Sequence, residues 1–450
     1  MVFAKTKSVC PVCLKVIPAE KDADRDGNIY MLKSCPEHGS FKTLIWEGDV
    51  RSYLNWQIEN RSIEAPVDGK EPSKGCPYDC GLCKEHLRKG CCMLLELTTR
   101  CNLRCPVCFA SAGEKESNDL SLEEIEKQYD YLMSHGGPFN IQLSGGEPTM
   151  RDDLPEIIST GLKKGFSFFQ LNTNGIRLAE EPGYALELKD AGLSCAFLQF
   201  DSLSDDAYLV LRGRKLRDLK LKAIENCREA GLGVVLVPVI APGVNDNEIG
   251  DILKFAVSNI PYVRGVHFQP VSYFGRNSLD RTLKRITIPL MLRLIEEQTG
   301  GIMKKADFAG GEAENPYCSF HASYLRRKDG SLKSLPRAGG NSSCCCCNTA
   351  SDDTRNFVAT QWGSLSAPAT QDTYRSADNG LTETSSLDAF LEYALKNTFT
   401  VSGMIFQDAY NLDLQRLKRC YICEMDRDLG MVPFCAYNLT DSNGKYLYRK

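Results

Sequence analysis

The sequence predicts an α/β fold built around a parallel sheet, and three observations lead to it. Short apolar runs alternate with helical patterns between residues 93 and 275, small and polar residues follow these runs, and many of the 21 cysteines lie outside this stretch. Strands that alternate with helices need crossover connections, which give parallel pairing. The expected parts are a metal module (1–45), a connector with cysteines (46–92), the α/β core (93–275) and a C-terminal cysteine-rich region (276–450).

The N-terminal part carries four candidate metal ligands in two tight pairs. Cys10 and Cys13 form the first pair, in the segment CPVC. Cys35 and His38 form the second, in CPEH. Such ligands suit tetrahedral zinc or a rubredoxin-like iron, and a module this small needs a metal to fold. The alternative is that His38 is a surface histidine beside a cysteine turn.

The connector repeats a cysteine spacing that also occurs further along the chain. Cys76, Cys80 and Cys83 form a CxxxCxxC triplet that follows no predicted strand. We therefore expect these thiols to hold an auxiliary iron–sulfur cluster. The candidates for a further ligand are Cys91, Cys92 and His86.

A second CxxxCxxC triplet follows the first predicted strand of the core. The apolar run at residues 93–98 is followed by Cys101, Cys105 and Cys108. Three thiolates can hold three corners of a [4Fe–4S] cubane and leave the fourth iron open for the amino and carboxylate groups of S-adenosylmethionine. A zinc knuckle or an ordinary ferredoxin loop is the alternative, but zinc sites favour paired CxxC units and ferredoxins favour CxxCxxC. With Phe109 after the last cysteine, the motif resembles that of the radical S-adenosylmethionine (radical SAM) superfamily.

The rest of the core continues the alternation of strands and helices. Five more apolar runs predict strands at 139–143, 166–171, 196–200, 234–240 and 263–268. Helical patterns cover 121–132, 182–191, 216–230 and 248–257. Ser121 and Glu124 form a capping-box signal at the start of the first helix. Functional residues in such sheets collect at the carboxyl ends of the strands.

Gly145, Gly146, Glu147 and Pro148 follow the second predicted strand. Two glycines let the backbone approach a ligand closely, although a tight turn alone also explains them. At this distance from the cysteine triplet, the segment resembles the motif that holds the methionine amino group in radical SAM enzymes.

The same resemblance implies roles for residues at later strand ends. Asn172, Asn174, Asp201 and Gln269 would surround the ribose and adenine, and Arg212 would pair with the methionine carboxylate. These residue types also occur at strand ends as turn formers. Apart from such a role, the basic run 212–222 is expected to be a solvated helix face.

The C-terminal region carries further cysteines. Cys318 lies in a turn-like context, and four cysteines stand in a row from Cys344 to Cys347, where adjacent side chains point to opposite faces and cannot all ligate one cubane. Residues 348–386 have the composition of a loop or a flexible cover, and 387–396 predict a helix. The expected ligands of a further iron–sulfur cluster are Cys318, Cys344, Cys420, Cys423 and Cys435, with a surface zinc knuckle as the alternative for the last three.

Several stretches together resemble one group within the radical SAM superfamily, the class D methylases and tetraether lipid synthases. They are 35–39 (CPEHG), 76–83, 101–110, 407–411 and 433–438, and the four-cysteine run further resembles the group named radical SAM (seleno)protein TrsS. The resemblance implies a partial (βα)6 TIM-type barrel. It also implies one [4Fe–4S] cluster that binds S-adenosylmethionine, one or two auxiliary [4Fe–4S] clusters and a mononuclear zinc or iron.

The expected function is a radical SAM reaction. A 5′-deoxyadenosyl radical would abstract hydrogen from an unactivated carbon of an organic or lipid-like substrate, followed by methylation or carbon–carbon coupling, with ferredoxin or flavodoxin as electron donor. The alternative is an iron–sulfur electron carrier or metal-handling protein that leaves S-adenosylmethionine intact. A formal net charge of −4 argues against nucleic acid as a partner. Lacking an apolar leader or a membrane-length run, the chain is expected in the cytoplasm.

Overall fold

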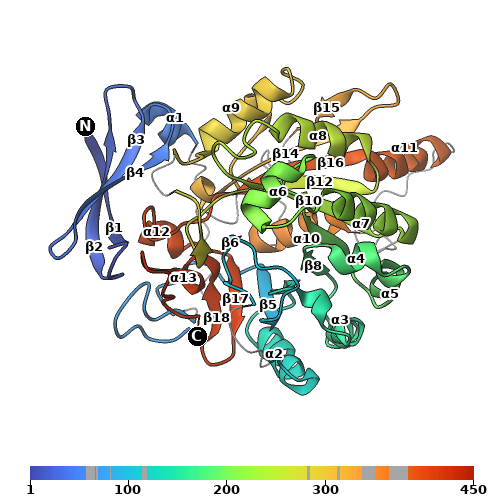
Figure 1. Ribbon diagram of the computed structural model, residues 1–450, viewed down its shortest axis with the longest axis horizontal. Coiled ribbons are helices and arrows are strands. Elements are labelled where there is room, and N and C mark those ends of the chain that lie inside the picture. The colour runs from blue at the N-terminus through green and yellow to red at the C-terminus, as the bar shows by residue number, and fades with distance from the viewer. Residues whose placement is uncertain are drawn as a thin grey trace.

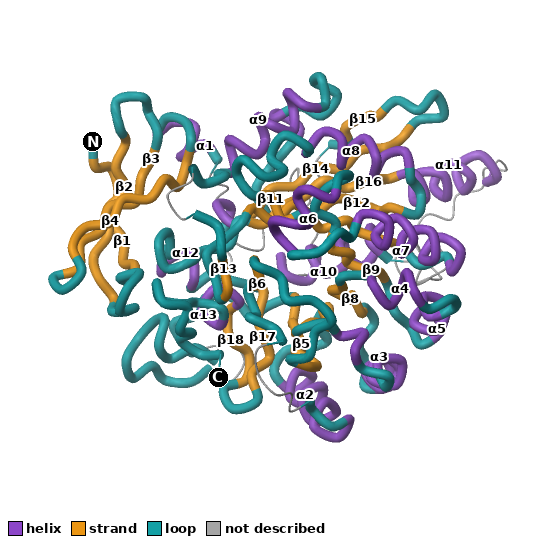
Figure 2. Tube along the Cα trace, in the orientation of Figure 1, coloured by secondary structure: helices purple, strands orange, loops and turns teal. Residues whose placement is uncertain are grey.

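The structure of the 450-residue chain is a computed structural model. It describes residues 1–56, 66, 69–81, 83–113, 119–280, 284–311, 315–336, 350–363 and 384–449. A small N-terminal sheet lies at one end, beside a larger body in which helices cover a long sheet (Figure 1). In the same orientation, the strands of the body gather in its middle (Figure 2).

Six parallel strands form the centre of the large sheet and confirm the predicted core. Their order is β12-β10-β9-β8-β7-β5, and every neighbouring pair is parallel. The strands are β5 (Cys92–Thr98), β7 (Asn140–Gly145), β8 (Phe169–Thr173), β9 (Cys195–Gln199), β10 (Gly233–Val237) and β12 (Val263–Pro270). The sheet runs on to β15 at one edge and β18 at the other, so the barrel is partial.

Helices connect these strands and cover their outer face (Figure 1). They are α2 (Leu122–Ser134), α3 (Leu154–Lys163), α4 (Ile176–Glu180), α5 (Tyr184–Asp190), α6 (Asp205–Arg212), α7 (Arg217–Ala230) and α8 (Ile249–Ser258). The predicted capping box is present at α2, where Ser121 Oγ accepts from Glu124 N at 3.2 Å and Ser121 N donates to Glu124 Oε2 at 2.8 Å. The buried residues of α2, α3 and α8 belong to the same hydrophobic core as those of the barrel strands.

Strands from the C-terminal region extend the sheet at both ends. β16 (Thr398–Met404) is parallel to β12, and β17 (Ile422–Asp426) is parallel to β5. Three antiparallel strands complete the sheet, namely β14 (Ser319–Arg326), β15 (Leu332–Ser334) and β18 (Gly430–Pro433). The hairpin of β17 and β18 is the one that the sequence indicated between Cys423 and Cys435. The strands β14, β15 and β16 were not predicted, and β14 and β16 pair across a long stretch of chain.

A helix lies at the amino ends of the strands β7 and β12, in a segment where the sequence indicated a loop. The expectation of a loop over 348–386 is wrong for α10 (Ala350–Trp362). Asn140 Nδ2 donates to the carbonyl of Arg355 at 3.1 Å, and Arg264 Nε donates to the carbonyl of Gln361 at 3.0 Å. These bonds fix the helix across the strand ends, so tertiary contacts outweigh its loop-like composition. Further along, α11 (Thr384–Asn397) confirms the helix expected at 387–396.

The N-terminal module is a four-stranded antiparallel sheet with the order β1-β2-β3-β4. Its strands are β1 (Val2–Val9), β2 (Val16–Ala23), β3 (Ile29–Cys35) and β4 (Gly39–Trp46), and α1 (Val50–Asn55) follows. The module docks beside α12 (Leu414–Leu417) through the buried ion pair of Lys21 Nζ and Asp413 Oδ2 at 2.7 Å. Lys33 Nζ adds a bond to the carbonyl of Ala409 at 2.6 Å.

Two further helices and several short elements connect these parts. They are α9 (Ile288–Gln298), α13 (Phe434–Tyr437), β6 (Val107–Cys108), β11 (Val239–Ile240), β13 (Arg276–Asn277) and the 3-10 turns η1 (Pro148–Met150), η2 (Lys305–Asp307) and η3 (Pro316–Cys318). Among the helices in the described ranges, none combines the length and the apolar character needed to cross a bilayer.

Candidate active site

The three cysteines that follow β5 lie on one loop, residues 99–113, which we call the cysteine loop. Cys101, Cys105 and Cys108 all line a cavity of about 280 Å³ that extends into the barrel. Cys105 is buried, and the other two are partly exposed. The predicted grouping is therefore present, at the carboxyl end of the first barrel strand.

Distant parts of the chain brace the cysteine loop. Arg276 Nε donates to the carbonyl of Cys105 at 2.7 Å, and β13 pairs with β6 inside the loop. Tyr446 Oη donates to the carbonyl of Phe109 at 2.6 Å. Sequence analysis missed Arg276 and Tyr446, because nothing local to either residue indicates contact with a loop more than 150 positions away.

The chemical environment of the thiols fits iron ligation. Burial raises the pKa of Cys101 to about 12 and also raises the pKa of Cys105. Free thiols in this pocket would be neutral, whereas iron binds thiolates and supplies the positive charge that offsets their burial. Three inward-facing thiols on one short loop match the donor set of a [4Fe–4S] cluster with one open iron.

Gly145 and Gly146 let the segment after β7 lie against the start of the cysteine loop. Gly145 has φ of +119°, and a Cβ there would lie 2.4 Å from the carbonyl oxygen of Thr98. A Cβ on Gly146 would lie 2.1 Å from the carbonyl oxygen of Arg100. The same backbone forms two hydrogen bonds, from Gly146 N to Thr98 O at 2.7 Å and from Glu147 N to Arg100 O at 2.8 Å. Glycine is required at both positions by this close contact.

Glu147 is buried, and its carboxylate is occupied by neighbouring protein donors. Oε1 accepts from the hydroxyls of Thr149 and Thr173, each at 2.7 Å, and Oε2 accepts from the backbone of Asn174 at 2.6 Å. Burial raises the pKa of Glu147 above its ordinary value in spite of these donors. The side chain therefore ties the end of β7 to the end of β8, and Pro148 begins the 3-10 turn η1.

Asp201 and Arg212 form a buried, bidentate ion pair. Arg212 Nε lies 2.7 Å from Asp201 Oδ2, and Nη2 lies 2.8 Å from Oδ1. Burial opposes the charge on Arg212, but Asp201 outweighs it, so the pKa of Arg212 is raised above its ordinary value. Arg212 Nη1 also donates to the carbonyl of Val107 at 3.2 Å, which supports the cysteine loop between two of its cysteines.

The basic run 212–222 is not a solvated helix face throughout, as was expected. Lys220 is fully buried on α7, and its Nζ donates to the carbonyl of Asn174. Burial lowers the pKa of Lys220 to about 8. Some residues of the run are buried and others are exposed, because one side of α7 packs against the carboxyl ends of the barrel strands, which we call the rim.

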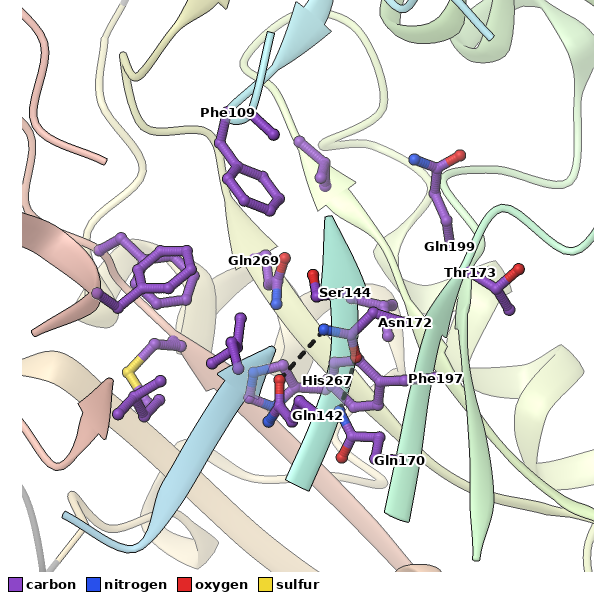
Figure 3. A pocket seen from close by; sticks show the side chains of 18 of the residues that line it. Phe109, Gln142, Ser144, Gln170, Asn172, Thr173, Phe197, Gln199, His267 and Gln269 are labelled. Carbon is purple, nitrogen blue, oxygen red and sulfur yellow. Dashed lines mark hydrogen bonds between the residues drawn. The ribbon is translucent and has the colours of Figure 1, made fainter. Parts of the chain in front are cut away.

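The remaining predicted strand-end residues lie either at the rim, beside the cysteine loop, or deeper in the cavity. At the rim, Asn174 Nδ2 donates to Asn102 Oδ1 of the cysteine loop at 2.7 Å. Asn172 and Gln269 line the cavity, near Ser144 and His267 (Figure 3). Asn172 Nδ2 donates to Gln142 Oε1 at 3.2 Å, so its side chain belongs to a polar network on the inner face of the barrel.

A second concentration of thiols lies beside the barrel cavity, which Cys91 and Cys92 also line. The neighbouring thiols of Cys76, Cys83 and Cys420 act with burial to raise the pKa of Cys80. Burial also raises the pKa of Cys435, with a smaller contribution from Cys420 and Cys318. The pKa of Cys423 is raised by burial and by the neighbouring thiols of Cys420, Cys80 and Cys92. No cysteine in the described ranges forms a disulfide. Cys76 and Cys80 pack against the hydrophobic cluster that contains Cys435, so the connector triplet and the C-terminal cysteines lie close together. Cys344 and the three cysteines after it lie outside the described residues.

His86 and Arg416 lie beside these thiols. His86 Nε2 lies 2.7 Å from the carbonyl oxygen of Cys420, and burial lowers the pKa of His86 to about 4. Arg416 Nη2 lies 3.3 Å from Cys318 Sγ. A neutral imidazole and a buried guanidinium therefore border the thiol group.

The four expected ligands of the N-terminal module are brought together. One ligand atom from each of Cys10, Cys13, Cys35 and His38 lies within 4.8 Å of all the others. His38 Nδ1 lies 3.4 Å from Cys35 Sγ and 3.7 Å from Cys10 Sγ. Two knuckles at the ends of antiparallel strands thus supply three cysteines and one histidine, the donor set of a structural zinc site.

Comparison with known proteins identifies the class. Residues 95–256 match the Radical SAM superfamily, and residues 2–47 match the HMPTM N-terminal zinc ribbon domain. The chain belongs to the radical SAM superfamily, whose members are enzymes that use a [4Fe–4S] cluster with S-adenosylmethionine.

One relative covers almost the whole chain. The 7,8-dihydro-6-hydroxymethylpterin dimethyltransferase of Methanocaldococcus jannaschii is 37% identical over 473 residues, which span 96% of this chain and 93% of the relative. The Fe-coproporphyrin III synthase of Methanosarcina barkeri is 39% identical over 186 residues, 40% of this chain and 44% of the relative. Streptococcus suis SuiB bound to S-adenosylmethionine aligns with 47% of this chain and 48% of its own, at 17% identity and a TM-score of 0.41.

Proposed function

We propose that this radical SAM enzyme methylates an unactivated carbon of a small substrate bound inside the barrel. The observation that carries this proposal is that the three thiols of the cysteine loop and the polar inner face of the barrel open into one cavity. A reactive radical made at the rim would meet a substrate there without crossing bulk water. The methylation is supported by the dimethyltransferase that covers nearly the whole chain.

The residues of the rim would hold the reactants in place. Cys101, Cys105 and Cys108 would bind a [4Fe–4S] cluster. When bound, this cluster supplies one electron that splits S-adenosylmethionine into methionine and a 5′-deoxyadenosyl radical, which takes a hydrogen atom from the substrate. The backbone at Gly145 and Gly146 would receive the methionine amino group, while Glu147 and the Asp201–Arg212 pair keep that backbone and the cysteine loop in position.

The proposed substrate is a reduced pterin or a related small heterocycle. The support is the printed substrate of the dimethyltransferase relative, together with the neutral polar groups that line the barrel. Apolar side chains such as Leu94, Val237 and Phe274 also line the cavity, but a lipid-like substrate would leave the buried amides beside them without hydrogen-bond partners.

The second concentration of thiols would hold one or two auxiliary [4Fe–4S] clusters. One set would include Cys76, Cys80 and Cys83, and the other would draw on the C-terminal thiols around Cys420. An electron donor such as ferredoxin or flavodoxin would reduce them. The zinc ribbon ligands would hold zinc, which suits their paired spacing.

Anaerobic reconstitution tests the proposal. The protein would be loaded with iron and sulfide, reduced with dithionite and mixed with S-adenosylmethionine and 7,8-dihydro-6-hydroxymethylpterin. A cell extract added to the reaction supplies the methyl donor, because S-adenosylmethionine that is split to the 5′-deoxyadenosyl radical transfers no methyl group. The expected products, identified by mass spectrometry, are 5′-deoxyadenosine and a methylated pterin. Redox-active iron without any cleavage of S-adenosylmethionine would instead support the electron-carrier alternative.

A further inference from the structure

The inner face of the barrel carries a connected row of amide side chains. Gln142 of β7 and Gln170 of β8 are partners in the strand register, and Asn172 lies two residues further along β8. Gln170 Nε2 donates to Asn172 Oδ1 at 2.9 Å, and Asn172 Nδ2 donates to Gln142 Oε1 at 3.2 Å (Figure 3). We call these three side chains the amide wall. They line the same cavity as the cysteine loop.

Amide side chains in the interior of a barrel reduce the stability of the folded protein when their hydrogen bonds stay unmade. Inward positions of parallel barrels are usually occupied by branched apolar residues. A primary amide can donate two hydrogen bonds and accept two, and burying it is unfavourable where these stay unmade. Gln170 is only 1% exposed, yet among the described residues its carbonyl oxygen accepts no hydrogen bond. The wall thus presents spare donors and acceptors to a ligand.

The surroundings of the wall carry little charge. The charged residues that line the cavity are Glu147, Arg212 and Arg355. The first two are occupied at the rim, and Arg355 Nη1 donates to the carbonyl of Pro138. His267 lies near the wall, and burial lowers its pKa to about 4, so it is neutral at pH 7. The wall itself therefore offers neutral hydrogen-bonding groups, which suit an uncharged ligand better than a phosphate or a carboxylate.

Flat side chains border the wall. Phe197 is the register partner of Asn172 on the neighbouring strand. Its ring centre lies 5.3 Å from that of His267 and 5.5 Å from that of Trp362. Aromatic faces of this kind pack against planar rings. A flexible alkyl chain could lie there too, but it would leave the amides without partners.

We propose that the amide wall is the substrate-recognition surface, and that the substrate is an uncharged, flat heterocycle with a cyclic amide edge. This inference rests on the proposed function and assigns it a binding subsite. Ring carbonyl and ring N–H groups would pair with the wall amides, and the ring plane would pack beside Phe197. The wall thereby orients the reacting carbon toward the rim.

Paired substitutions test this assignment. The variants are Gln142→Leu, Gln170→Leu and Gln170→Glu, with Gln128→Leu as a matched control on α2, where the amide is buried but away from the cavity. Equilibrium dialysis of 7,8-dihydro-6-hydroxymethylpterin against the reconstituted protein measures binding. Each wall variant should weaken binding by about 10- to 100-fold, which is the loss expected when one or more hydrogen bonds go unmade. The control should change it by less than about twofold.

A melting curve separates recognition from folding. Both leucine variants should melt at or above the wild-type temperature, because a recognition surface costs stability. Lower melting of both would mean that the amides serve the fold, and it would overturn the inference. Wild-type affinity in the wall variants would also overturn it, and so would a wild-type protein that cleaves S-adenosylmethionine but does not bind the pterin. A wild-type protein that fails to cleave S-adenosylmethionine would reject the proposed function itself.

Discussion

Two regions of one cavity use polar side chains in opposite ways. At the rim, Glu147, Asp201 and Arg212 direct their hydrogen bonds to other protein groups. On the amide wall, Gln142 and Gln170 face the cavity with donors and acceptors to spare. The rim is therefore built to hold a loop in a fixed geometry, whereas the wall is built to meet a ligand.

The difference assigns the reaction to the rim and the choice of substrate to the amide wall. A cluster loop must keep its thiols at fixed positions, which requires buried ion pairs and close glycine contacts. A recognition surface must leave its hydrogen-bonding groups available until the ligand arrives. Changes at the rim should thus remove the reaction or the fold, and changes at the wall should alter which molecule is bound.

The largest effect is expected from Cys105→Ala. Removal of one cluster ligand should reduce 5′-deoxyadenosine formation to the level seen without protein, because a cubane held at two corners is not retained. Zinc content of the N-terminal module should stay at the wild-type value. Cys227→Ala is the matched control, since this thiol is buried in α7 away from the cavity. Normal turnover by Cys105→Ala would remove the basis for assigning the loop to the cluster.

The next effect is expected from Asp201→Asn. It leaves Arg212 buried without its charge partner, which should lower the free energy of unfolding by about 3–5 kcal/mol. Because Arg212 also supports the carbonyl of Val107, the variant should retain less iron after reconstitution. Urea denaturation and iron analysis measure the two effects. Asp251→Asn, which breaks an exposed pair with Lys254, should change neither, and equal losses in both variants would contradict the structural role of the rim.

The smallest effect is expected from pH. Burial lowers the pKa of His267 to about 4, so its proton is lost well below pH 6. The unfolded chain keeps an ordinary histidine pKa. The contribution of neutral His267 to the free energy of unfolding is therefore lost only as the pH falls from about 6.5 toward 4. Pterin binding measured by dialysis should therefore vary by less than about twofold between pH 6 and 8. A tenfold change over this interval, absent in His267→Gln, would show that His267 titrates in the binding range.

The sequence predicted the part of the fold that rests on local periodicity. Six core strands and the helices α2, α5, α7 and α8 follow from alternation of apolar runs, and the cysteine spacings indicated the metal-binding groups. The helices α3, α4 and α6 were not among the predicted ones. The strand β16 and the pairing of β17 with β5 were not predictable in the same way, since the partner strands β12 and β5 lie far along the chain. The helix α10 was hidden by a composition typical of loops.

The roles of individual polar residues were harder to predict. Arg212 was expected to pair with the methionine carboxylate, but only the structure reveals Asp201 as its partner. The amide wall was overlooked, although its signal exists: polar residues alternate with apolar ones in β7 and β8. When helices cover the outer face of such a sheet, the polar set has to face the barrel interior.

An anaerobic crystal structure with S-adenosylmethionine and the reduced pterin tests the account most directly. We predict a [4Fe–4S] cluster on Cys101, Cys105 and Cys108, and the pterin ring hydrogen-bonded to Gln142, Gln170 and Asn172. Zinc or a fourth protein ligand at the cysteine loop, or a pterin bound away from these amides, would contradict it.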